Sequence, residues 1–559
     1  MQGDGIATLP AIAAGALTLC GAALVSDIFG LVGSGFDFLQ AKTPSGNKGT
    51  SGWVKSLREI KTELIQSGGG PYWGAFKNIP VFSEFVSNAM CIAPAGAGKT
   101  SGAVLTNCLS IRDDKILTDF KGEISCSVKQ ELEDRGEVFH ALNLGGLWED
   151  ALGPSACYNP LDLIADHLEC PGGLCDIVDD LRGMSAQLVP DPVKTGGSGD
   201  NKHFTEGERD LIAYGKLQNA ILHHRRANLG EVCHMMNDVD ALLKEAQWVC
   251  GRLVVNGQKQ MMPIENLPWI QKHDPQEVAN FIEYHRGTAA ALCDLIEATD
   301  SRTFNSFLTG TRQALRPFNK TTRTHKVLSK STLRFSDCKT SEETNTISII
   351  ADDSRSEAQK PVVGLLQYCA MIEIKRAENK KRPVYFIMDE ATNFTIQNLP
   401  ELLTFGRGYG LRLLLIFQSI SAFVKAYGEE AFNILWSETE IKQFLPGQRE
   451  PRVLKMISEL LAEQTIKTKD YNGGRGRGVD GYGYREEASP LMTEDEIRRC
   501  KKTLLAIRDK KVMQVDLPPI AAIHPWRDQV GINPFYGKPF RLPIKLRIPR
   551  KFLKKRRRS

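Results

Sequence analysis

Five short, almost continuously apolar runs occur along the chain between residues 115 and 418. Strands that are covered by helices on both faces need this pattern, because neither face meets water. Longer stretches with helical spacing separate several of these runs, which is typical of an α/β domain with a parallel sheet. We therefore predict strands in KILTDF (115–120), EVFHALNL (137–144), TISIIAD (346–352), PVYFIMDE (383–390) and LRLLLIFQ (411–418).

The region between about residues 176 and 315 has a different pattern. Its segments repeat apolar residues at helical spacing and contain few strand-like runs. A chain of 559 residues is too long for one hydrophobic core. We therefore predict an all-helical domain over 176–315, inserted into an α/β domain whose two parts are 70–175 and 316–525.

The N-terminus carries 22 residues without a charge, from Gly5 to Ser26, which is about the length that crosses a bilayer. We predict a membrane anchor over 1–41 and a polar linker over 42–69. A buried core helix and a cleaved or disordered leader are the alternatives. The lysines that follow the apolar stretch favour a cytoplasmic location for the rest of the chain. They are Lys42, Lys48 and Lys55.

The C-terminal end is strongly basic. Residues 541–559 hold ten Lys or Arg and no acid, although the net charge of the whole chain is only +5. Because Pro, Lys and Arg dominate after residue 525, we expect a basic tail over 526–559 without a packed domain. Such a tail is either a solvated arm or a contact for nucleic acid or anionic lipid.

The overall composition describes a globular chain. Charged residues make up 25% and hydrophobic residues 42% of it, which excludes a disordered protein and one embedded throughout in a membrane. Thirteen cysteines are spread along the chain without a Cys-x-x-Cys pair. This usage favours reduced thiols over a disulfide framework or a zinc site.

The sequence APAGAGKT (93–100) contains the elements of a phosphate-binding loop. Such a loop needs backbone N–H groups that point at the phosphates, with no side chain in the way and a helix N-terminus behind. Lys99 would reach the β- and γ-phosphates of ATP, and the Thr100 hydroxyl would bind Mg²⁺. Four small residues precede the lysine: Ala95, Gly96, Ala97 and Gly98.

A pair of acids ends the run PVYFIMDE. Asp389 and Glu390 lie at the strand tip, where ligands bind in parallel sheets. Asp389 would hold Mg²⁺ through its water shell, and Glu390 would orient the water that attacks the γ-phosphate. A strand that simply ends in solvated acids is the alternative. Loop and acids occur in the right order inside an α/β pattern, and together they predict a working ATP site.

Two further residues extend this prediction. Gln418, at the end of the next strand, would sense the γ-phosphate. Arg407 lies in the glycine-flexible turn GRGYG before that strand and is a candidate for an arginine that completes the site of a neighbouring subunit. An arginine exposed on a turn without such a role is the alternative. Arg412, on the strand itself, suits the role less well.

Several motifs together resemble those of the TraG-like coupling proteins of type IV secretion and conjugation systems. They are APAGAGKT, TDFKGEI, YNPLDLI, FIMDEATNF and GRGYGLRLLLIFQSISAF. The segment SPLMTEDEI (489–497) is similar to that family's sequence near the end of its ATPase domain. The similarity covers about residues 70–515.

The resemblance implies a hexameric ATPase anchored in the inner membrane, with most of the chain in the cytoplasm. It implies a RecA-like domain that binds ATP and Mg²⁺, and an inserted all-helical domain that helps to recruit cargo. The cargo would be relaxase-bound single-stranded DNA or protein effectors, which the ring couples to a secretion channel. The residues carried over are Lys99 and Thr100 in the loop, Asp389 and Glu390 in the acidic pair, Gln418 as sensor, and Asp119 and Lys121 in a motif beside the cleft.

Two features depart from the family pattern. Ala93 replaces the first glycine of the loop and would cost about 1 kcal/mol if its φ had to be positive. Only one N-terminal span is predicted where the family usually has two, because DIFGLVGSGFDFL is short and interrupted by acids.

Two other functions fit the same motifs. One is a soluble DNA-translocating ATPase of the FtsK/HerA type; the N-terminal span and the helical insertion favour the coupling protein over it. The other is a non-hydrolysing docking receptor, which Ala93 supports and Glu390 opposes. The segment NGGRGRGVDGYGYR (472–485) either contacts single-stranded DNA or is an unstructured loop without a ligand. Its relevant side chains are Arg475, Arg477, Tyr482 and Tyr484.

Overall fold

The computed structural model describes residues 48–49, 51–61, 70–191, 200–298, 301–471, 482–508, 510–538 and 540–553. The chain forms two compact units, the larger from residues 54–453 and 499–559 and the smaller from residues 1–53 and 454–498. The anchor predicted over 1–41 lies outside the described residues. Within the described ranges, no helix has the length and apolar character that crossing a bilayer requires.

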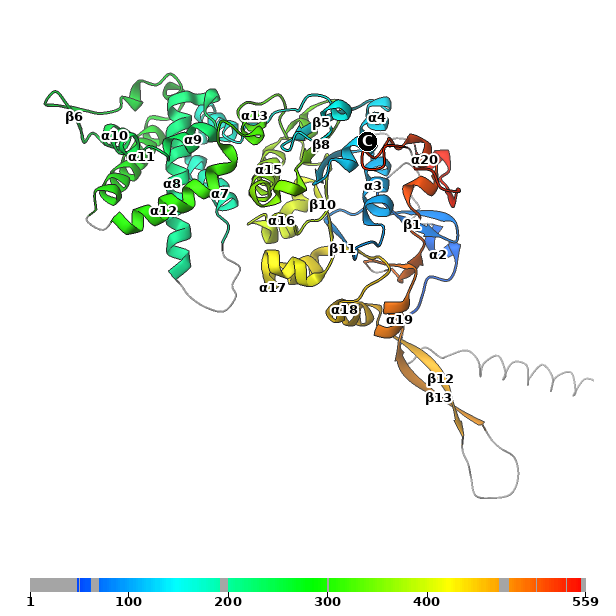
Figure 1. Cartoon of the computed structure of the whole chain (residues 1–559). Helices are drawn as coiled ribbons and strands as arrows, with labels where there is room; N and C mark the ends of the chain where they lie inside the picture. Colours follow the sequence, from blue (N-terminus) through cyan, green and yellow to red (C-terminus); the bar gives the residue numbers. More distant parts are fainter. Residues whose placement is uncertain are drawn as a thin grey trace, which may run out of the picture. The chain divides into compact units, whose positions relative to one another are not determined.

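A nine-stranded sheet forms the core of the larger unit (Figure 1). Seven neighbouring strands, from β11 to β5, run parallel, and β14 and β15 continue the sheet antiparallel beyond β11. The predicted α/β fold with a parallel sheet is therefore confirmed. In spatial order the strands are β15 (Met513–Val515), β14 (Thr503–Ile507), β11 (Thr439–Phe444), β3 (Asn88–Ile92), β10 (Leu411–Phe417), β9 (Val384–Met388), β4 (Asp114–Asp119), β8 (Thr344–Ile350) and β5 (Glu137–Asn143).

The five predicted strands are β4, β5, β8, β9 and β10, whereas β11 was not predicted. Four of the six residues in the β11 sequence TEIKQF are polar, so it does not look like a buried strand. The structure makes it one because the polar groups find partners: the buried Gln443 side chain donates to the carbonyl of Trp73 at 3.1 Å. A buried amide with a partner costs little, and an unpaired one costs a few kcal/mol.

Helices cover both faces of this sheet (Figure 1). Helices α3 (Leu105–Ser110) and α4 (Glu123–Asp134) lie on one side. Helices α15 (Ser356–Arg376), α16 (Leu399–Phe405) and α17 (Ile420–Glu438) lie on the other. Coverage of both faces explains why the central strands are apolar throughout.

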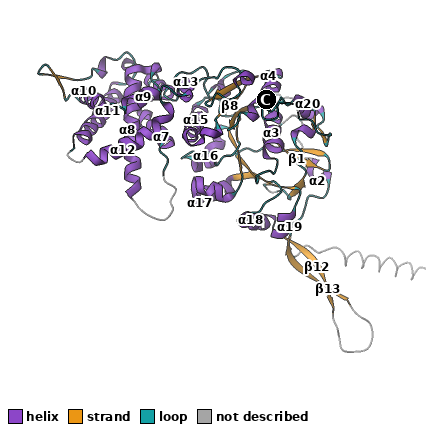
Figure 2. Cartoon of the chain, in the orientation of Figure 1, coloured by secondary structure: helices purple, strands orange, loops and turns teal. Residues whose placement is uncertain are grey.

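The segment between β5 and β8 is mostly helical (Figure 2). One departure from the all-helical prediction is a short hairpin of β6 (Leu253–Val255) and β7 (Gln258–Gln260). The insertion is tied to the core by ion pairs, since Arg376 of α15 lies 2.5 Å from the buried Asp180. Its main helices are α7 (Ile177–Leu188), α8 (Asp200–His223), α10 (Val239–Val249), α11 (Pro275–Glu297) and α12 (Ser301–Leu315).

The predicted second part of the α/β domain, 316–525, is not continuous, because residues 454–498 belong to the smaller unit. That unit contains a two-stranded antiparallel hairpin, β12 (Glu463–Tyr471) and β13 (Tyr482–Pro490). Lys469 pairs with Tyr484, and Tyr471 with Tyr482. Arg475 and Arg477, the candidates for a contact with single-stranded DNA, lie outside the described residues.

The prediction of an unpacked tail is wrong for residues 526–553. Trp526 is 1% exposed, and its ring lies 5.3 Å from that of Tyr72. Phe552 stacks on Phe82 at 5.4 Å, and β17 (Leu546–Arg547) pairs with β16 (Ile523–His524). The prediction was wrong because it relied on the basic composition and overlooked the large apolar residues of this segment. These residues complete the core beside the hairpin of β1 (Tyr72–Phe76) and β2 (Ile79–Phe82). Residues 554–559 lie outside the described ranges.

The predicted linker is also wrong in part. Val54 and Ile60 are buried in the same core cluster as Trp526 and Phe552. The N–H of Val54 donates to the carbonyl of Val512 at 3.1 Å. Val54 and Ile60, inside the predicted linker, are therefore part of the packed domain.

Candidate nucleotide-binding site

Three adjacent strand ends bring the predicted site together. Strands β3, β10 and β9 are neighbours in the sheet and run parallel, with Phe417 level with Ile92 and Leu415 level with Met388. The glycine-rich loop, Gln418 and the acidic pair follow these three strands. They consequently lie at one edge of the sheet, the carboxyl edge, where parallel sheets bind ligands.

The loop after β3 has the backbone that phosphate binding requires. Gly96 and Gly98 have φ values of 76° and 80°, in the left-handed region that glycine adopts without strain. No heavy atom lies within 4 Å of the position that a Cβ on Gly96 would occupy, so there is open space beside the loop. Lys99 then begins a π-helical turn, Lys99–Val104, that continues into α3.

Ala93 does not weaken this loop in the way the sequence suggested. Its φ is not among the positive values of the described residues, and its side chain is 1% exposed and packed in the core. Its N–H donates to the carbonyl of Phe417 at 2.9 Å, which extends the pairing of β3 with β10. The expected strain is absent, and the methyl group points into the core rather than into the cleft.

Lys99 joins the loop to the acids across β10. Its Nζ lies 3.2 Å from Oδ1 of Asp389 and also contacts the carboxylate of Glu390. Glu390 has a φ of 57°, an uncommon conformation for a residue other than glycine, and one that occurs most often at functional sites. The two halves of the predicted site are therefore in direct contact.

Burial and charge shift the pKa values of these groups. Burial raises the pKa of Asp389 to about 6, although the Lys99 ammonium opposes the shift. Burial opposes the charged form of Lys99 as well, but the carboxylates of Asp389 and Glu390 raise its pKa above the usual value. The Lys99 ammonium thus compensates the charge of two partly buried carboxylates. A Mg²⁺ ion could pair with the same carboxylates, and a phosphate could pair with the ammonium.

Gln418 and the loop line one cavity of about 510 Å³. The Gln418 side chain is exposed, directly after β10. The cavity is also lined by Arg449, an exposed residue in the loop after β11 that the sequence did not indicate. No sequence signal indicated Arg449, because the strand before its loop, β11, was not predicted.

Asp119 and Lys121 have different surroundings. Asp119, at the end of β4, is 1% exposed. Its carboxylate accepts hydrogen bonds from the N–H groups of Gly122 and Ser125 at 2.8 and 2.9 Å and from the Ser125 hydroxyl at 2.8 Å. It therefore holds the start of α4. Lys121 is exposed and lines another cavity of about 580 Å³ with Trp148.

Arg407 lies away from the site of its own chain. It is exposed on the turn that precedes β10, at the amino edge of the sheet, whereas Lys99 lies at the carboxyl edge. Arg412, by contrast, is occupied: its guanidinium lies 2.7 Å from Glu84 and 5.2 Å from the centre of the Tyr385 ring.

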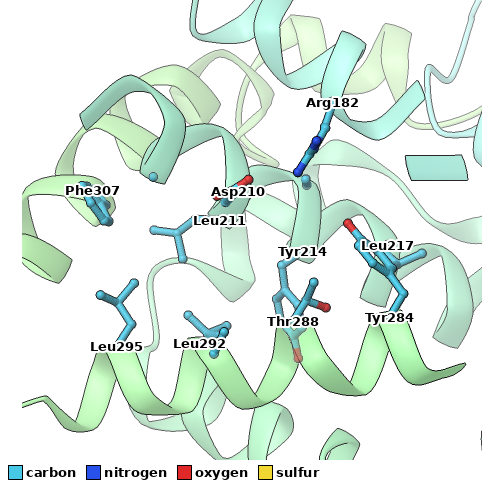
Figure 3. A pocket seen from close by; sticks show the side chains of 13 residues that line it. Arg182, Asp210, Leu211, Tyr214, Leu217, Tyr284, Thr288, Leu292, Leu295 and Phe307 are labelled. Carbon is cyan, nitrogen blue, oxygen red and sulfur yellow. The ribbon is translucent and has the colours of Figure 1, made fainter. Parts of the chain in front are cut away.

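A separate cavity of about 260 Å³ lies in the helical insertion (Figure 3). Leu292 and Leu295 of α11 point toward Leu211 of α8, and Arg182 and Asp210 lie at one end. Its lining is mostly apolar.

A parallel α/β sheet with a glycine-rich loop after one strand and an acidic pair two strands away defines the fold of the RecA-like P-loop NTPases. Plasmid coupling protein TrwB, solved with ADP and Mg²⁺, has this fold: the TM-score is 0.57 at 14% identity, over 83% of this chain and 92% of TrwB. TrwB solved with the non-hydrolysable ATP analogue ADPNP also gives 0.57, over 84% and 93% of the two chains.

The sequence identifies the family. The profile of the type IV secretory system conjugative DNA transfer family matches residues 44–513. The conjugal transfer protein TraG of Escherichia coli is 23% identical over 431 residues, 74% of this chain and 61% of TraG. The chain thus spans under two thirds of the length of TraG. It belongs to the conjugative DNA transfer family, and the resemblance to TraG-like proteins is confirmed.

Proposed function

We propose that this chain is an ATPase that recruits relaxase-bound single-stranded DNA, protein substrates or both to a type IV secretion channel and powers their transfer. The observation that carries the proposal is the contact of Lys99 with Asp389 and Glu390 across β10. It joins the loop and the acids at the carboxyl edge of the sheet. The conjugative transfer family supports the cargo class.

The residues present fit ATP with Mg²⁺. The open space beside Gly96 leaves room for phosphates on backbone N–H groups of the loop, although the N–H of Ala97 donates to the carbonyl of Pro94 at 3.1 Å. Lys99 would hold the phosphates, and Thr100 and Asp389 would hold the metal ion. Glu390 would position and deprotonate the attacking water, and Gln418 would sense the phosphate beside it. When bound, ATP supplies the phosphoryl group that is transferred to water.

The location of Arg407 supports assembly into a ring. It is exposed at the amino edge of the sheet, so it serves a site only if a neighbour's carboxyl edge faces it. A head-to-tail contact between copies produces that arrangement and closes into a ring. We propose a homo-hexamer at the inner membrane, anchored through residues 1–41, with most of the chain in the cytoplasm.

The two alternative functions are less well supported. The docking receptor depended on Ala93, whose backbone is unstrained and whose side chain is buried. The soluble FtsK/HerA-type pump shares the ATPase core, but the matched family is one of conjugative DNA transfer.

ATP hydrolysis by the full chain tests the proposal. We expect mixed-sequence single-stranded DNA to stimulate hydrolysis, and Lys99→Ala to lower the rate by about 10²–10³-fold or more, because the phosphate charge loses its fixed cation. Lys425→Ala, an exposed lysine of α17, is the matched control. Unchanged hydrolysis in Lys99→Ala would refute the site, and hydrolysis that DNA does not alter would refute DNA as the cargo.

A further inference from the structure

The C-terminal segment 532–544 concentrates apolar side chains on the surface. Of the thirteen large apolar side chains that are exposed in the described ranges, five lie in this segment, with exposed fractions of 40–70%. Gathered and exposed apolar groups of this kind mark an interaction site. The five are Ile532, Phe535, Tyr536, Phe540 and Ile544.

This exposure is a property of the folded chain, because the backbone of the segment is held at both ends. The N–H of Gly531 donates to the carbonyl of Ser127 at 2.7 Å. The N–H of Leu542 donates to the carbonyl of Ala521 at 2.9 Å, and the Leu542 carbonyl accepts from the Arg527 guanidinium at 2.7 Å. The backbone is therefore anchored on both sides of the exposed side chains, and the Phe535 ring packs edge-on against Trp148 at 5.4 Å.

The same stretch of chain is cationic from Lys538 onward. Residues 529–559 contain eleven Lys or Arg and no Asp or Glu. From Lys538 onward the cations lie among the exposed apolar residues, and the Arg541 guanidinium also lies 3.7 Å from Asp528. The cations whose side chains are exposed in the described part of this stretch are Lys538, Arg541, Lys545, Arg547 and Arg550.

We propose that segment 532–545 docks on an anionic bilayer surface. Apolar and aromatic side chains enter the boundary between lipid headgroups and acyl chains, while adjacent lysines and arginines bind the anionic headgroups. A bilayer takes up both kinds of side chain at once, which explains why they are interleaved.

Other occupants fit the surface less well. Single-stranded nucleic acid would pair with the cations and stack on the aromatic rings, but Ile532 and Ile544 have no π-face on which a base could stack. A neighbouring copy of the chain would bury the apolar groups, but interface cores are depleted in lysine, and here Lys538 and Lys545 lie among those groups.

The position of the segment in the fold agrees with a membrane contact. Val54 and Ile60 follow the N-terminal region and share a core cluster with Trp526, Leu546 and Phe552. Residues near both ends of this domain therefore contribute to one core cluster. The inference rests on the proposed function in one respect: the proposed N-terminal anchor would keep this segment close to a bilayer.

Hydrogen–deuterium exchange, read by mass spectrometry on peptides from 532–545, tests the proposal. The full chain is placed in nanodiscs of phosphatidylcholine alone or mixed with phosphatidylglycerol, or, if it does not enter discs, is mixed with vesicles of the same compositions. We expect slower exchange with phosphatidylglycerol and reversal of this effect by high salt. Each cation near an anionic surface contributes about five-fold to binding, so Lys538→Gln with Arg541→Gln and Lys545→Gln should weaken docking roughly a hundred-fold.

Matched controls separate this surface from charge in general. Lys259→Gln with Lys272→Gln and Lys425→Gln removes three exposed cations elsewhere and should leave the protection unchanged. Because exchange is measured without hydrolysis, an inactive ATPase site does not affect the result. The proposal is overturned by equal protection in both lipids, by protection that single-stranded DNA alone produces, by protection that appears only when ATP assembles the chain, or by no protection.

Discussion

The nucleotide site and the cavity of the helical insertion differ in the side chains that form them. The nucleotide site places Lys99, Gln418 and the acidic pair at the ends of three neighbouring strands, and Glu390 has a left-handed backbone. The cavity lies between helices and is lined mainly by apolar side chains such as Leu217 and Leu292. The cleft is therefore organised for charge and reaction, and the insertion for packing. A change in one should leave the other intact.

The largest effect is expected in the cleft. Glu390→Gln should keep nucleotide binding but slow hydrolysis by about 10²–10⁴-fold, because the attacking water loses its base. Steady-state hydrolysis together with a nucleotide-binding titration separates the two quantities. Glu401→Gln, an exposed residue of α16, is the control. Loss of binding in Glu390→Gln would show that this residue holds the cleft together rather than acting on water.

In the insertion, Leu217→Ala should lower the free energy of unfolding by about 2–5 kcal/mol, because a side chain that is 1% exposed leaves a void. Thermal unfolding measures the effect on the insertion, and nucleotide affinity measures the effect on the nucleotide site. Leu222→Ala, on the same helix but 38% exposed, should change stability far less. A marked fall in nucleotide affinity with Leu217→Ala would contradict the independence of the two regions.

We expect Lys216 to make the stability of the insertion depend on pH. It is buried, and burial lowers its pKa to about 7 from a usual value near 10.5; its ammonium donates to the carbonyl of Leu181 at 2.7 Å. Between these two values the unfolded chain binds more protons than the folded chain, so stability rises with pH. We expect the melting temperature of the wild type, relative to Lys216→Met, to rise from pH 7 toward pH 10. A constant difference would show that Lys216 keeps its ordinary pKa.

The smallest effect is expected at Ala93. Ala93→Gly should leave nucleotide affinity within about two-fold and reduce stability by only about 0.5–1 kcal/mol, because the residue is unstrained and glycine is more flexible when unfolded. Gly96→Ala, at a φ of 76°, should instead weaken binding by about five-fold. A clear gain of affinity in Ala93→Gly would restore the view that the alanine impairs the loop.

The sequence by itself determined the features that depend on neighbouring residues. The five apolar strands, the glycines at 96 and 98 and the acids at 389 and 390 could all be predicted, because a buried strand and a phosphate loop each impose a pattern over a few consecutive positions. The helical character of the insertion followed from its periodicity in the same way.

Only the tertiary structure decided what depends on distant partners. It made TEIKQF a strand by giving Gln443 a hydrogen bond to Trp73, and it packed the basic C-terminal segment by placing Trp526 against Tyr72. It also placed Lys99 against the acids that are about 290 positions away in the chain. Burial and pairing are properties of the assembled core, and local composition does not carry them because the partners lie hundreds of residues apart.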